Sequence, residues 1–184
     1  MAITPAQSAR SLRNLYLVRT GFQVIWTAGI ALTAITRPVT AAVLLILYPL
    51  WDVACTLYDL KNSGQMGAAR RSQTINAVLG VVTAIAIALT VFSQPAYAIA
   101  AFGAWALAAG LLQLIVGLFR RKQLGGQWAM ILSGAQSSAA GIFFVLGGLA
   151  GKLHVKDLGG YATFGAIYFL IGGILLARRA SRAS

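Results

Sequence analysis

The chain has 184 residues, of which 59% are hydrophobic and 10% are charged. A soluble domain has about 25% charged residues, so this composition excludes a soluble globular protein and predicts an integral membrane protein. The formal net charge of +12 does not indicate a nucleic-acid partner, because the basic residues form short clusters between apolar runs. That distribution is typical of polytopic membrane proteins whose partner is the lipid bilayer.

Several apolar runs are long enough to cross a bilayer, which takes about 20 mostly apolar residues in a helix. We predict an all-α membrane protein, with residues 1–184 as a single membrane domain and the first run as an uncleaved span. The six expected spans cover residues 14–35, 38–60, 74–93, 96–119, 128–149 and 158–177. They group into three hairpins, which cover about 14–60, 74–119 and 128–177. Arg37-Pro38 and Gln94-Pro95 mark tight turns, because proline disfavours helix in the residue before it.

The run from Pro38 to Leu60 contains two charges, the carboxylates Asp52 and Asp59. An unpaired carboxylate in a bilayer costs about 2.5–3.5 kcal/mol, so such residues are usually paired and often functional. Arg19, in the first span, lies about 9 Å along its helix from the inner end, and Asp52 lies about 13 Å along the next helix. Adjacent antiparallel helices therefore bring Arg19 and Asp52 within reach of each other.

We predict that Arg19 and Asp52 form an ion pair. The pair either locks the first hairpin or belongs to a site for an ion, a proton or a polar ligand. Gln23 continues the face of Arg19 at helical spacing, and Tyr48 and Asp59 continue the face of Asp52. These five residues are the candidate site. The remaining alternative is that Asp59 and Arg19 are isolated charges whose side chains extend toward the headgroups. All charge inside the membrane is expected in this first hairpin, with Arg19 as its only buried arginine.

Other polar residues inside the spans have two interpretations. Asn76, Thr83 and Thr90 recur every seven residues in the third span and share one face. Interhelical hydrogen bonds of about 0.6 kcal/mol each would explain them, and a polar translocation path is the alternative. Further polar residues within spans are Gln113, Gln136, Ser137 and Ser138.

Glycines recur at seven-residue spacing in the last three spans and therefore share one helix face in each. Small residues let helix backbones approach closely, and membrane helices associate through such packing. We expect a tightly packed bundle, and the glycine faces also allow a homo-oligomer or a larger membrane complex. The glycines are Gly103, Gly110, Gly117, Gly134, Gly141, Gly148, Gly165 and Gly172.

Lys and Arg residues cluster at alternate connections between the expected spans. Eleven lie on the side of the two termini and three on the other side, so the positive-inside rule predicts that the N-terminus and the C-terminus are in the cytoplasm. The eleven include the cluster Arg120-Arg121-Lys122, which we assign to the loop between the fourth and fifth spans. The aromatic residues expected at the two membrane interfaces are Tyr16, Tyr58, Trp128, Tyr97 and Tyr161.

The later spans carry a recurring pattern. Gln94-Pro95 forms a hairpin turn, and the basic cluster Arg120-Arg121-Lys122 is followed by Gly126-Gln127-Trp128 and, later, by the pair Gly172-Gly173. In these residues, between about 70 and 180, the chain resembles the HdeD-like family of short-repeat bacterial inner-membrane proteins. The resemblance implies six spans in three hairpins, a bacterial inner-membrane location and a link to acid resistance or general stress response. It implies no catalytic site, and the first hairpin departs from the repeat.

From this resemblance we expect a small non-enzymatic inner-membrane protein with a stress-related or accessory structural role. The alternative is a small transporter or channel for protons or a polar solute, which uses the charges of the first hairpin. The sequence has no catalytic, metal-binding or nucleotide-binding motif, and we expect no cofactor. An intramembrane enzyme would need a reactive Cys55 or a bound cofactor.

Overall fold

The computed structural model describes residues 5–63, 66–122 and 127–180. Within these ranges the chain forms helices, and six of them are long and apolar enough to cross a membrane. The prediction of an all-helical chain with six helices of spanning length is therefore confirmed. The helices are α1 (Pro5–Thr33), α2 (Pro38–Asn62), α3 (Gly67–Thr90), α4 (Pro95–Arg120), α5 (Trp128–Leu149) and α6 (Gly159–Ala180), with a short 3₁₀ turn, η1 (Val155–Leu158), before α6.

Proline sets the start of two helices. Pro38 is the first residue of α2 and Pro95 is the first residue of α4. The residues before them, Arg37 and Gln94, are not helical, with ψ near 73° and 72°. Proline disfavours the α conformation in the residue before it and has the φ angle that the first helical turn needs. The two predicted turns therefore lie where the sequence placed them.

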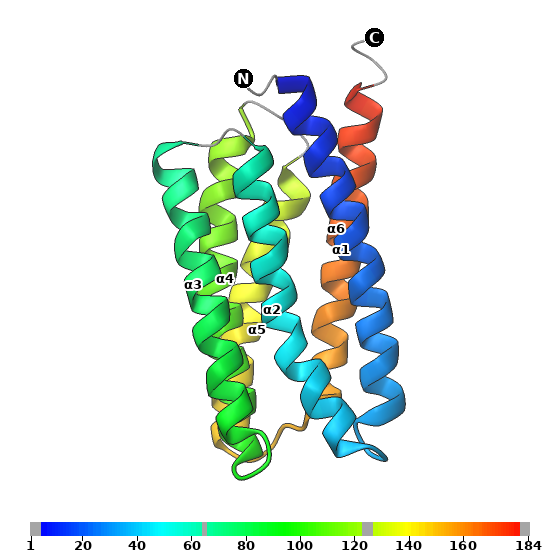
Figure 1. The fold of residues 1–184 in the computed structure, drawn as a ribbon, viewed down its shortest axis with the longest axis vertical. Coiled ribbons are helices and arrows are strands. Elements are labelled where there is room, and N and C mark those ends of the chain that lie inside the picture. Colours follow the sequence, from blue (N-terminus) through cyan, green and yellow to red (C-terminus); the bar gives the residue numbers. More distant parts are fainter. Residues whose placement is uncertain (1–4, 64–65, 123–126, 181–184) are drawn as a thin grey trace.

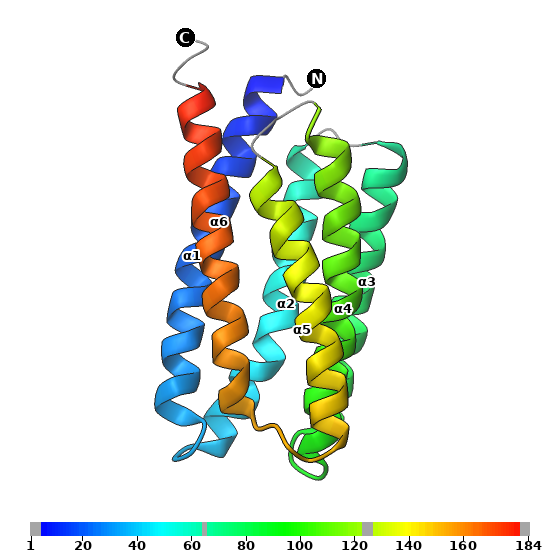
Figure 2. The same cartoon turned by 180° about the vertical axis from the view of Figure 1, so that it is seen from behind.

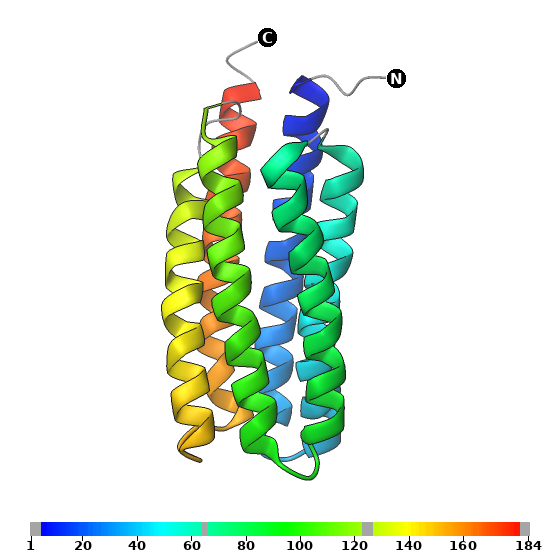
Figure 3. The same ribbon diagram turned by 90° about the vertical axis from the view of Figure 1, so that its left-hand side faces the viewer.

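The helices run up and down and form a closed ring in chain order. Each helix packs against the next one, and α6 packs against α1 (Figures 1 and 2). Packing is most extensive between α4 and α5 and between α1 and α6, and it is much less extensive between α1 and α2 and between α5 and α6. The start of α1 and the end of α6 lie at the same end of the bundle (Figure 3). We call this the basic end, because the Lys and Arg clusters flank the helices there.

The glycine faces produce the closest helix contacts, as predicted. A Cβ atom added to Gly141 of α5 would lie 2.3 Å from the backbone nitrogen of Leu107 in α4, and one added to Gly110 would lie 2.6 Å from the carbonyl oxygen of Gly134. The glycines of α6 instead face α1, where Gly172 meets the ring of Tyr16. The absence of side chains therefore brings α4 against α5 and α6 against α1.

Gly141→Ala is expected to destabilise the protein by about 1–3 kcal/mol. The added methyl group would meet backbone atoms of α4, which cannot move aside as a flexible side chain can. Gly21→Ala is the matched control. Gly21 is an exposed residue of α1 with no atom within 4 Å of the added Cβ. Thermal unfolding in detergent micelles measures both, and equal melting temperatures for the two variants would contradict the close approach.

The two halves of the bundle interior differ. The half away from the basic end is filled by an apolar core that includes Trp26, Leu45, Ile87 and Phe102, each no more than 1% exposed. The half toward the basic end contains most of the buried polar side chains. The buried polar groups that could form a functional site therefore concentrate toward the basic end.

The predicted aromatic belts are found only in part. Tyr58, Tyr97 and Trp128 are exposed near the helix ends, with 46%, 51% and 50% of their surface accessible. Tyr16 is buried, and the hydroxyl of Tyr161 is hydrogen-bonded within the bundle. The prediction was wrong for these two. Helix α1 begins at Pro5, so Tyr16 lies well inside it, and Tyr161, although near the start of α6, faces Ser137 of α5.

Candidate functional site

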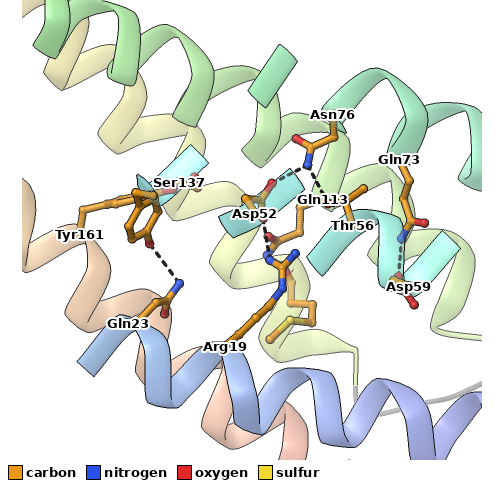
Figure 4. A network of polar contacts seen from close by, with 12 residues as sticks. Arg19, Gln23, Asp52, Thr56, Asp59, Gln73, Asn76, Gln113, Ser137 and Tyr161 are labelled. Atoms are coloured by element: carbon orange, nitrogen blue, oxygen red, sulfur yellow. Dashed lines mark hydrogen bonds and ion pairs between the residues drawn. The ribbon is translucent and has the colours of Figure 1, made fainter. Parts of the chain in front are cut away.

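The ion pair expected between Arg19 and Asp52 is present. The Arg19 guanidinium Nη1 of α1 lies 2.8 Å from the Asp52 Oδ1 of α2 (Figure 4), and the two side chains are 14% and 15% exposed. The guanidinium also lies 5.0 Å from the ring centroid of Phe169 in α6. The cation therefore contacts both an anion and an aromatic face, two interactions that stabilise a positive charge inside the bundle.

The second oxygen of Asp52 is held by α3. The amide Nδ2 of Asn76 donates to Asp52 Oδ2 at 2.6 Å and also lies 3.2 Å from the hydroxyl of Thr56 (Figure 4). The predicted hydrogen bonding by the third span is thus correct for Asn76. Thr90, on the same predicted face, donates instead to the carbonyl of Ala86 in its own helix. Asp52 consequently joins α1, α2 and α3.

Asp59 has a partner that the sequence did not predict. Its carboxylate accepts hydrogen bonds from the guanidinium of Arg120 in α4 and from the amide of Gln73 in α3. The side chains of Arg120 and Asp59 are 6% and 8% exposed. Asp59 is therefore a buried, paired carboxylate, and the alternative of an isolated charge at the headgroups is wrong.

Arg120 corrects two expectations from the sequence. The sequence predicts that it lies in a loop, but α4 includes it, and its side chain is buried in the bundle while Arg121 is exposed. Successive helical residues differ by about 100° in direction, so adjacent arginines point to different sides. Charge inside the bundle is therefore not confined to the first hairpin, and Arg19 is not its only buried arginine.

Gln23 and Tyr48 extend the site toward the apolar core. The Gln23 amide Nε2 donates to the Tyr48 hydroxyl at 3.1 Å, and the two residues are 8% and 5% exposed. A Cβ atom on Gly165 of α6 would lie 2.8 Å from Gln23 Oε1. Because Gly165 has no side chain, the amide of Gln23 can occupy that space. Tyr48 also packs against the rings of Phe102 and Trp105.

Two cavities meet at the Arg19–Asp52 pair. The larger, of about 90 Å³, extends from this pair to the Asp59–Arg120 pair. The smaller, of about 50 Å³, extends from the same pair to Tyr48 and to the contact between α5 and α6. Four residues line both cavities: Arg19, Asp52, Gln113 and Phe169. The five candidate residues thus border two adjacent cavities that share the Arg19–Asp52 pair in their lining.

Further polar residues line the smaller cavity. The Ser137 hydroxyl donates to the Ala106 carbonyl at 3.0 Å and lies 2.8 Å from the Tyr161 hydroxyl. Tyr168 of α6 donates to Gln136 of α5 at 2.8 Å. The sequence singled out Gln136 and Ser137 as polar residues inside a span. It did not connect them with the two tyrosines of the following helix.

Gln73 could have been found from the sequence. It lies three residues before Asn76 on the same face of α3. Asp52 and Asp59 lie seven residues apart on one face of α2. Two amides on one face of α3 therefore lie opposite two carboxylates on one face of α2, and the structure places one amide beside each carboxylate.

Several buried polar atoms at the cavities have no hydrogen-bond partner in the structure. They are Gln23 Oε1, Gln73 Oε1, Asn76 Oδ1, Arg19 Nε and Trp105 Nε1. Buried polar groups are nearly always hydrogen-bonded to protein or to water. Unused acceptors and donors beside a polar cavity therefore indicate space for water or for a small polar ligand.

No three His, Cys, Asp or Glu side chains come together as a metal site in the described part of the chain. Cys55 is buried and unpaired. Comparisons with protein-family models, with curated proteins and with solved structures found no match to this chain.

Proposed function

We propose that the protein is a small membrane transporter or channel for protons or a small polar solute, with the Arg19–Asp52 pair at its centre. The observation that supports this is that two cavities, each with charged and polar side chains in its lining, meet at that pair. Charged residues inside membrane spans are rare and generally line solute or ion pathways. A cavity of about 90 Å³ has room for several water molecules.

The same geometry suggests where the protein moves. The apolar core around Phe102 and Trp26 closes the interior at the end away from the basic end. For a solute to cross the membrane, helices must therefore separate at the end away from the basic end. The contact between α5 and α6 is the least extensive between consecutive helices, and the smaller cavity reaches it. We propose that α5 and α6 open relative to each other while the tightly packed pair α4 and α5 stays together.

Asp52→Asn is expected to abolish protein-dependent flux in proteoliposomes loaded with a pH indicator or an osmotically active solute. The substitution removes the negative charge that both cavities share. Flux is compared at equal amounts of folded protein. Asp157→Asn is the matched control, because Asp157 lies in η1 outside both cavities and should leave flux unchanged. Flux that survives Asp52→Asn would contradict the proposal.

A second candidate function is the accessory or stress-related structural role that the HdeD-like resemblance implies. The observation in its favour is that both interior carboxylates already have arginine partners on other helices, α1 for Asp52 and α4 for Asp59. Such pairs hold the bundle together without any ligand. We propose on either view a non-enzymatic protein of a bacterial inner membrane with both termini in the cytoplasm. Absence of flux from the wild-type protein would favour this second role.

A further inference from the structure

The charges that line the two cavities cancel. The larger cavity is lined by two arginines and two carboxylates, and the smaller one by Arg19 and Asp52. Each arginine is hydrogen-bonded to one of the carboxylates. The interior therefore holds no net charge that could neutralise an incoming ion. A charge taken out of water without a partner is strongly unfavourable, whereas a neutral solute brings no such penalty.

The smaller cavity also offers unused hydrogen-bonding capacity to a neutral ligand. Gln23 is 8% exposed, lines this cavity and has an acceptor, Oε1, without a partner. Arg19, which lines the same cavity, has an unused donor, Nε. Gly165 leaves the amide its space. Together these residues present both an acceptor and a donor, which is what a hydroxyl or amide group requires.

We infer that the solute is a small, neutral molecule with hydrogen-bond donors and acceptors, such as a polyol or an amide, and that Gln23 binds it in the smaller cavity. The inference rests on the proposed function and narrows its substrate class to exclude ions. The Arg19–Asp52 pair then serves as a neutral polar wall, and it need not separate fully for the solute to bind.

The test uses the full-length protein in proteoliposomes with urea and glycerol as neutral probes. Stopped-flow light scattering follows the uptake of the probes, and ion-sensitive dyes follow protons, potassium and chloride. Wild-type protein is expected to raise urea or glycerol permeability above that of protein-free vesicles and to leave the ion permeabilities unchanged. Gln23→Met keeps the side-chain length but removes the amide, and should lower the neutral permeability about tenfold, as the loss of one hydrogen bond predicts.

Thr90→Val is the matched control, because the Thr90 hydroxyl bonds within its own helix and lies outside both cavities. It should leave the neutral permeability unchanged. Asp52-dependent flux of protons or ions without urea or glycerol uptake would overturn the inference and leave the proposed function standing. No protein-dependent flux of any probe would overturn both. Equal neutral-solute permeability in Gln23→Met and Thr90→Val would show that Gln23 does not bind the solute. The selectivity of the wild-type protein for neutral probes over ions tests the substrate class even if Gln23→Met does not fold.

Discussion

Arg120→Gln is expected to lower the free energy of unfolding in detergent micelles by about 3–5 kcal/mol. Removing one member of a buried ion pair leaves the other charge without compensation, and losses of this size are typical. Asp59 would keep the amide of Gln73 as a hydrogen-bond donor but would lose its counter-charge. The pair is the more buried of the two in the interior. Chemical denaturation monitored by tryptophan fluorescence measures the effect.

Arg121→Gln is the matched control for this prediction. Arg121 is the next residue in the chain, and its side chain is exposed. Surface substitutions usually change stability by less than about 0.5 kcal/mol. The same chemical change at two neighbouring positions should therefore differ by several kcal/mol. Similar losses for the two variants would show that Arg120 is not buried beside Asp59.

Asp52→Asn and Arg19→Gln are each expected to lower the free energy of unfolding by about 3 kcal/mol, because each leaves an unpaired partner in the interior. The double variant is expected to lose clearly less free energy of unfolding than the sum of the two single-variant losses. Its second substitution removes a charge that the first has already left unpaired. Residues in direct contact typically show coupling energies of about 0.5–3 kcal/mol. A double-mutant cycle in the same detergent measures this coupling.

Asp157→Asn combined with Arg19→Gln is the control cycle, because Asp157 lies in η1 and forms no ion pair with Arg19. Distant sites add within about 0.3–0.5 kcal/mol. Additive losses for Arg19 and Asp52 as well would mean that their contact contributes nothing to stability. Because Asn76 also holds Asp52, Asn76→Leu in the Asp52→Asn background provides a second measure of the same network.

Much of the fold follows from local sequence. Apolar runs of about 20 residues predict the six spans, and proline places the starts of α2 and α4. The heights of Arg19 and Asp52 along neighbouring helices predict their ion pair, because the rise per residue is constant and adjacent antiparallel helices share a register at their turn. Glycines at seven-residue spacing predict close helix packing without identifying the partner helix.

The sequence by itself therefore determined the spans, the tight glycine faces and the pairing of Arg19 with Asp52. Only the tertiary structure decided that α6 closes the ring against α1, that Arg120 turns inward, and that Asp59 finds its counter-charge 61 residues further along the chain. The physical reason is that these features depend on the rotation of each helix about its axis and on which helices are neighbours. Those quantities are set by packing between distant segments, and no local pattern encodes them.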